Sequence, residues 1–150
     1  VTAKKVGKAT ITCTLKNGKK YNCAVTVRRN EYVSKPFDEL RYGSYGDVNI
    51  ELYRAYYEGN TLVVEVGAYN NRAFYANSFD YITLDVHYSR IAEGIIDYGS
   101  IAKKKFTHVP INLSPYNKKL MTFRIPVKKK YDLQALKPIV SCEYWYNWSY

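Results

Sequence analysis

Hydrophobic and polar residues alternate along much of the first thirty residues. The apolar positions of residues 9 to 15 share one face: Ala9, Ile11, Cys13 and Leu15. Those of residues 21 to 28 share another: Tyr21, Cys23, Val25 and Val27. A period of two indicates a half-buried strand, and Asn17-Gly18 tolerates the positive φ of a tight turn. The pattern therefore predicts a β-hairpin.

The alternation stops after the hairpin and returns further along the chain. Residues 31 to 46 contain Pro36, Gly43 and Gly46, which predicts a linker. From Asp47 onward the pattern predicts strands at 48–52, 62–68, 79–88, 121–127 and 139–148, with weaker segments at 92–98 and 106–113. A single helical turn is expected at 132–136. Short strands in this number predict an all-β antiparallel sandwich over residues 47 to 150.

The first segment also carries a family resemblance. The run VTAKKVGKATIT, then NGKKY, then CAVTV resembles the C-terminal third of a bacterial immunoglobulin-like domain, group 2. Residues 1 to 30 would then be the last hairpin of such a repeat. The resemblance implies an extracellular, wall-associated or adhesin-like protein and says nothing about chemistry.

Residues 47 to 150 resemble the immunoglobulin-like modules of secreted Gram-positive surface proteins. The resemblance rests on GNTLVVEVGAYNN, on the step at residues 111 to 115 before TFRIPV, and on YDLQALKP before an aromatic strand. It implies an immunoglobulin-like topology for the predicted sandwich. Fold alone does not supply a function.

Charge and tyrosine divide the chain at the same place. Of the net charge of +10, residues 1 to 30 carry +8 with no acidic residue, while 16 of the 17 tyrosines follow residue 30. This division favours two modules and weakens whole-chain basicity as an argument for a polyanionic partner. The chain contains no run of 18 apolar residues, and it begins at Val1 without a signal peptide or initiator Met. We therefore expect a piece of a longer extracellular protein.

The three cysteines match no metal-binding spacing. A three-residue loop centred on Gly18 would set Cys13 directly opposite Cys23, which leaves a disulfide or two small inward thiols as alternatives. Cys142 is expected to be a buried free thiol. His87 and Asp85 point to the same side of a predicted strand, but an exposed histidine is favoured over a metal ligand. No metal and no cofactor is expected.

No common enzyme signature occurs in the chain, so we expect no catalytic residues and no enzyme. Lysine runs at or beside predicted loops offer contacts for a polyanion or simply keep strand edges soluble. These lysines are Lys103, Lys104, Lys105, Lys118, Lys119, Lys128, Lys129 and Lys130.

The C-terminal strand is the candidate ligand site because planar aromatic side chains beside polar ones grip sugar rings and peptides. The candidate residues are Trp145, Tyr146, Asn147 and Trp148. The alternative is that Trp145 covers an edge of the sandwich.

The expected function is that of a non-catalytic extracellular or cell-surface module, a structural spacer or an adhesion or ligand-binding domain. The alternative is a carbohydrate-binding module that uses exposed aromatics near the C-terminal strand. Expected partners are a cell-wall polymer, a glycan or a protein ligand, with neither nucleic acid nor membrane insertion. An isolated hairpin is marginal in water, so its apolar face is expected to dock on the main domain or on a second copy.

Overall fold

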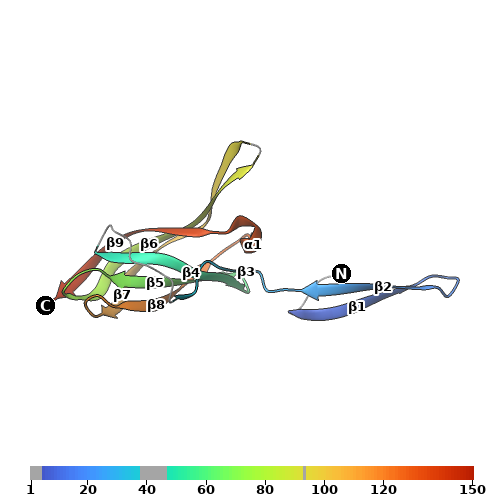
Figure 1. The fold of residues 1–150 in the computed structure, drawn as a ribbon, viewed down its shortest axis with the longest axis horizontal. Coiled ribbons are helices and arrows are strands. Elements are labelled where there is room, and N and C mark those ends of the chain that lie inside the picture. The colour runs from blue at the N-terminus through green and yellow to red at the C-terminus, as the bar shows by residue number, and fades with distance from the viewer. Residues whose placement is uncertain (1–4, 38–46, 93) are drawn as a thin grey trace. The chain divides into compact units, whose positions relative to one another are not determined.

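The structure is a computed structural model that describes residues 5–37, 47–92 and 94–150 (Figure 1). The chain divides into two compact units, Val1–Asn30 and Glu31–Tyr150. The boundary falls where charge and tyrosine content change. Each unit is described by itself below.

The first unit is the predicted β-hairpin. Strand β1, Gly7–Thr14, pairs antiparallel with β2, Lys20–Val27. The N–H of Leu15 donates to the carbonyl oxygen of Lys19 at 2.8 Å, and the N–H of Gly18 donates to that of Leu15 at 2.9 Å. Gly18 has a φ of 80°, a left-handed conformation that favours a residue without a Cβ. The loop is therefore centred on Asn17.

This centre shifts the predicted pairing of the two cysteines. Cys13 lies opposite Tyr21, and Cys23 lies opposite Ile11, so the expected direct opposition of the two thiols is wrong. Both cysteines are exposed and free, and no bridge joins them. The predicted apolar face is confirmed, because directly paired residues share a face and its members pair with one another across the hairpin. The pairs are Ala9 with Val25, Ile11 with Cys23 and Cys13 with Tyr21. Docking of this face stays a prediction.

The second unit is an all-β sandwich of antiparallel strands. One sheet has the order β3-β4-β5-β8, formed by Glu31–Val33, Val48–Glu58, Thr61–Asn70 and Lys118–Pro126. The other has the order β7-β6-β9, formed by Ile95–Leu113, Tyr75–Ala92 and Ile139–Ser149. β4 and β5 form a hairpin within one sheet, and the other sheet begins with β6. An immunoglobulin-like strand order is not confirmed.

Two boundary predictions are corrected. The predicted segment at 92–98 spans the end of β6 at Ala92 and the beginning of β7 at Ile95. From Ile95 on it forms one strand with the segment at 106–113, because an edge strand tolerates the intervening charges of Lys103 to Lys105. The predicted linker is wrong at its start, since β3 pairs with β4 and supplies hydrogen bonds to that strand's edge. Three residues are too few to show an alternation. Residues 38 to 46 of the predicted linker lie outside the described residues.

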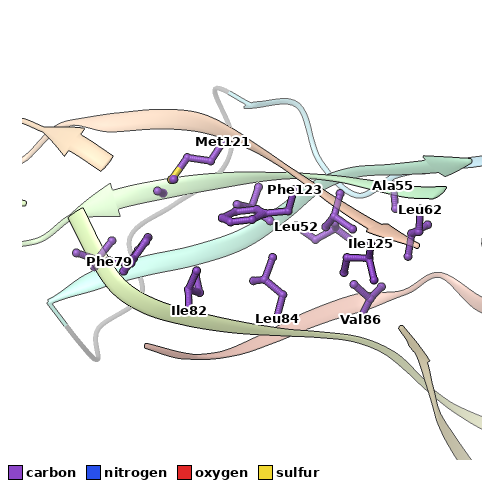
Figure 2. Close-up of a cluster of buried hydrophobic side chains, with 14 of the residues drawn as sticks. Leu52, Ala55, Leu62, Phe79, Ile82, Leu84, Val86, Met121, Phe123 and Ile125 are labelled. Atoms are coloured by element: carbon purple, nitrogen blue, oxygen red, sulfur yellow. The ribbon is translucent and has the colours of Figure 1, made fainter. Parts of the chain in front are cut away.

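The core lies between the two sheets (Figure 2). Ile82, Leu84 and Val86 are two residues apart on β6, and the pleat turns all three toward the opposite sheet. Met121, Phe123 and Ile125 of β8 meet them from the other side in the same spacing. The alternation read from the sequence is thus the alternation of buried and exposed residues on these strands.

Tyrosine hydroxyls tie the two sheets together at one end. The hydroxyl of Tyr144 on β9 donates to the carbonyl oxygen of Val48 at 2.7 Å and accepts from the N–H of Val48 at 3.1 Å. The hydroxyl of Tyr146 donates to a carboxylate oxygen of Asp47 at 2.8 Å. Burial first, and then the bond to Asp47, raises the pKa of Tyr146. These tyrosines therefore join the layers of the sandwich, with apolar rings inward and hydroxyls bonded.

Candidate functional site

The outward face of the β7-β6-β9 sheet is the candidate site. The strand register fixes which of its residues are neighbours, in three rows across the sheet. The rows are Thr107, Tyr81 and Trp145; then Lys105, Thr83 and Glu143; then Lys103, Asp85 and Ser141. Directly opposed residues of adjacent strands share a face about 4.5–5.5 Å apart at Cβ. The face therefore carries aromatic, acidic, basic and hydroxyl side chains close together, and we call it the outer face.

Tyr81 and Trp145 supply the aromatic part of the outer face. The side chain of Trp145 is 64% exposed, although tryptophan is a residue that burial strongly favours. The hydroxyl of Tyr81 donates to Glu143 Oε1 at 3.2 Å, and Lys105 Nζ lies 4.1 Å from the centroid of the Tyr81 ring. The bond to Glu143 raises the pKa of Tyr81, because the hydroxyl donates its proton to the carboxylate. Tyr81 is thereby held in position from two sides.

A shallow pocket of about 170 Å³ opens on the outer face beside the aromatic row. Its lining consists of Thr83, Asp85, Lys103, Ser141, Cys142 and Glu143. Asp85 accepts from Ser100 Oγ at 2.8 Å and lies 3.6 Å from Lys103 Nζ. Hydroxyl, carboxylate and ammonium groups thus converge on one depression, next to an exposed aromatic ring.

The structure divides the four predicted ligand residues between two sides of β9. Trp145 lies on the outer face, as does Asn147, whose Nδ2 donates to Asp80 at a β-bulge of β6. Tyr146 instead points to the opposite side and bonds to Asp47. Trp148 also alternates to that side and lies 4.9 Å from Phe74 between ring centroids. Tyr146 and Trp148 therefore do not share the outer face with Trp145 and Asn147, because successive residues of a strand alternate in direction.

The lysine runs do not gather in one place. Lys103, Lys128 and Lys129 line a common pocket between β7 and the end of β8, together with apolar residues. Lys118 and Lys119 lie at the beginning of β8, at the other end of that strand, where Lys118 Nζ donates to the carbonyl oxygen of Phe37. Lys104 Nζ lies 5.0 Å from the Phe106 ring centroid. Lys105 belongs to the outer face, and Lys130 follows β8.

Sequence reasoning missed the acidic and hydroxyl residues of the outer face. Tyr81, Thr83 and Asp85 alternate outward on β6, and Ser141 and Glu143 do so on β9, so the alternation marked each of them as exposed. The pattern did not show that β9 pairs with β6 across more than fifty intervening residues. That pairing brings the two sets together.

The described residues contain neither a metal centre nor a membrane helix. No group of three or more His, Cys, Asp or Glu side chains in that part of the chain is placed to hold a metal ion. The described helix, α1, Leu133–Leu136, is the helical turn predicted at 132–136, and no helix in the described ranges is long and apolar enough to span a bilayer. His87 is buried rather than exposed as predicted, with its Nδ1 3.1 Å from the carbonyl oxygen of Asp85.

Cys142 is expected to differ sharply from the other cysteines in reactivity. Burial raises the pKa of its thiol to about 11, whereas Cys13 and Cys23 are exposed. Because the thiolate is the nucleophile, Cys142 should react at pH 8 on the order of 100-fold more slowly than an ordinary thiol with a pKa of ~8.5. Ellman's reagent should detect two rapidly reacting thiols in the native protein and three in the denatured protein.

A Cys142→Ala variant is the control, since it should lose only the slow thiol. The raised pKa of Cys142 also makes the free energy of unfolding depend on pH. The protonated thiol's contribution to stability is complete below the unfolded pKa of ~8.5 and is lost as the pH rises toward the folded pKa. Three equally fast thiols in the native protein would contradict the burial of Cys142.

Comparisons with protein-family models, with curated proteins and with solved structures find no match to this chain.

Proposed function

We propose that the chain is a non-catalytic, extracellular ligand-binding module whose sandwich presents the outer face to its ligand. The observation that carries the proposal is the exposed Trp145 opposite Tyr81, beside a pocket lined by hydroxyl, carboxylate and ammonium groups. Strand pairing and side-chain bonds hold these groups before any ligand arrives, which reduces the entropy lost on binding. A rigid surface that binds a ligand would serve in adhesion. The spacer role would require only the rigid sandwich itself.

A glycan is the ligand class that the outer face fits best. A sugar ring offers an apolar C–H face and a rim of hydroxyl groups, which match a flat aromatic ring and flanking polar groups respectively. Trp145 supplies the flat ring, while Asp85 and Glu143 accept hydrogen bonds and Lys103 donates them. We therefore propose carbohydrate binding as the specific form of the ligand-binding role.

The extracellular location is proposed from the residues of the first unit. The order VTAKKVGKATIT, NGKKY, CAVTV resembles that of the last hairpin of a bacterial immunoglobulin-like group 2 repeat, and residues 7 to 27 form a hairpin. The immunoglobulin-like character of the second unit is part of the same proposal. In that location an anionic wall polymer is a further partner for Lys103, Lys128 and Lys129, which line one pocket.

Trp145→Ala tests the proposed site. Loss of an exposed stacking ring should weaken glycan binding by about tenfold or more, on the scale of one to two kcal/mol for an aromatic contact. A glycan array should identify a ligand for the unaltered protein, and a titration with that ligand should give the affinities. Trp148→Ala is the matched control, because it removes the same side chain from the other side of β9.

Different results separate the parts of the proposal. If no arrayed glycan binds the unaltered protein, carbohydrate binding is abandoned. If a glycan binds and both tryptophan variants retain its affinity, the ligand lies elsewhere than on the outer face. A melting temperature measured for each variant shows that lost binding is not lost folding.

A further inference from the structure

Strands β6 and β7 run on beyond the strand that flanks them. Pairing of β6 with β9 ends at His87 opposite Ile139, whereas pairing of β6 with β7 continues to Ala92 opposite Ile95. We call residues 88 to 92 and 94 to 100 the arm. Figure 1 shows it standing clear of the two sheets. Within the described residues, neither outer edge of the arm has a strand beside it.

The arm is a two-stranded ribbon with exposed isoleucines near its tip. The ring of Tyr88 covers Gly99, so a Cβ at that position would approach the phenol oxygen to 2.8 Å. Arg90 Nε pairs with Asp97 Oδ2 at 2.7 Å across the ribbon. Beyond this ion pair the described residues are uncharged, and Glu93 lies outside the described residues. The large apolar side chains of the arm are between 61% and 77% exposed: Ile91, Ile95, Ile96 and Tyr98.

Such a concentration of exposed isoleucine on one projection is unusual for a free surface and typical of an interface. The residues along the outer edge of β7 also support an interface at the arm. Past the arm, β7 carries Lys103 to Lys105 and Pro110, which are residues that discourage another strand from pairing with an edge. From Ile95 to Ile101 the edge has neither lysine nor proline, and its one charge, Asp97, is already paired. The arm is the unprotected part of this edge.

A pocket of mixed apolar and basic lining lies at the root of the same arm. It has a volume of about 210 Å³ and opens between β7 and the end of β8. Its apolar lining consists of Ile101, Ala102, Ile125, Pro126, Val127 and Tyr131. The pocket is also lined by Lys103, Lys128 and Lys129. The isoleucines of the tip are uncharged, so they would add no positive charge that repels these lysines. One molecule therefore carries exposed isoleucines near the tip of a short ribbon and a pocket with apolar residues in its lining at the root of that ribbon.

We propose that the arm is a self-association site, at which β7 of one copy pairs antiparallel with β7 of a second copy about a two-fold axis at Tyr98. This inference goes beyond the proposed glycan binding at the outer face and does not depend on it, whereas in the dimer Ile95 of the other copy takes the pocket proposed above for an anionic polymer. In an antiparallel pair centred on Tyr98, Ile95 of each copy lies opposite Ile101 of the other. Each tip thus reaches the other copy's root.

The faces of the strands agree with this register. Ile95, Asp97 and Gly99 alternate onto the side of β7 to which Tyr88 points, and the bulge of β7 at Ile101 keeps that residue on the core side. Ile95 of one copy therefore arrives on the pocket side of the other, beside Ile101. A two-fold axis makes the contact self-complementary and closed. The two β7-β6-β9 sheets become one continuous sheet, with main-chain hydrogen bonds joining the copies.

Sedimentation velocity on the full chain tests the proposal. A pair of this size belongs with small, weak interfaces, so the unaltered protein should be mainly dimeric at about 100 µM and dissociate on dilution. Ile95→Lys places an ammonium group against a pocket that already contains lysines and should raise the dissociation constant at least about tenfold. Tyr116→Lys is the matched control, because Tyr116 is equally exposed but lies in the turn between β7 and β8. It should leave the dimer unchanged.

Cross-linking tests the register. In a background with Cys13→Ser and Cys23→Ser, Tyr98→Cys should form a disulfide-linked dimer on mild oxidation, since directly paired residues are about 4.5–5.5 Å apart at Cα. Tyr116→Cys should not. A protein that remains monomeric at the highest concentration, a dimer unaffected by Ile95→Lys, or equal cross-linking of both cysteine variants would overturn the proposal.

Discussion

Phe79→Ala is expected to lower the free energy of unfolding of the sandwich by about 3–5 kcal/mol, the range for deleting a buried phenylalanine. Phe79 has no exposed surface, and its ring lies 5.2 Å from that of Tyr144 between centroids. Truncation removes the transfer free energy of the ring and leaves a cavity between two paired sheets. Strand pairing on both sides of β6 prevents the walls from collapsing into that cavity.

Urea unfolding followed by tryptophan fluorescence measures this loss, because Trp145 and Trp148 both lie on β9 and report on the second unit. Two controls define the cause. Phe79→Leu retains most of the volume and should cost less than about 1.5 kcal/mol. Tyr75→Ala removes an aromatic ring from a half-exposed position of the same strand and should cost about 0.5 kcal/mol or less. Equal losses for Phe79→Ala and Tyr75→Ala would contradict a core between the sheets.

Asn70→Asp is expected to cost about 3–5 kcal/mol at pH 7, although the two side chains have nearly the same shape. Asn70 has no exposed surface. Its Nδ2 donates to the carbonyl oxygens of Phe74 at 2.7 Å, Leu113 at 3.2 Å and Ser114 at 3.3 Å, and its Oδ1 accepts from the N–H of Arg72. A carboxylate there faces three acceptors, donates to none of them and carries a buried charge.

The Asn70→Asp loss should depend on pH in a defined direction. Burial and the carbonyl oxygens raise the pKa of a carboxyl group at this position. A raised pKa means that the folded variant holds its proton to higher pH than the unfolded chain does. Its stability is therefore greatest below the unfolded pKa of ~3.9 and declines as the pH rises through the folded value. The difference in unfolding free energy from the unaltered protein should widen over that window.

Asn112→Asp is the matched control for this prediction. Asn112 is exposed and has a φ of 49°, a conformation that asparagine and aspartate both tolerate. Its replacement should change stability by less than about 0.5 kcal/mol at any pH in the window. A loss for Asn70→Asp that does not change with pH would show that the buried charge is not its cause.

Most strands of the second unit could be predicted because their apolar residues repeat every two positions. Ile82, Leu84 and Val86 repeat in this way within the strand predicted at 79–88, and all three are buried. Boundaries were harder to predict, since β7 continues through Lys103 to Lys105 where the alternation fails. A charge interrupts the pattern without interrupting the backbone hydrogen bonds of an edge strand.

The candidate site could be predicted only in part. Trp145 was expected to be a ligand residue and lies on the outer face, because its direction follows from alternation along one strand. Its neighbours Tyr81, Thr83 and Asp85 come from β6, whose pairing with β9 is a long-range choice that no local pattern records. Within the hairpin, even a local pairing depended on the turn, and a loop centred one residue earlier moved Cys13 away from Cys23.

The sequence by itself therefore determined that this protein consists of β-strands, where its two units divide, and which side of most strands is apolar. These properties depend on the two-residue period of an extended backbone and on local charge. Only the tertiary structure decided the order of strands in each sheet, the grouping of polar residues on the outer face and the projection of the arm. Those depend on hydrogen bonds between distant segments and on the turns and bulges that set their register, which the hydrophobic pattern leaves open.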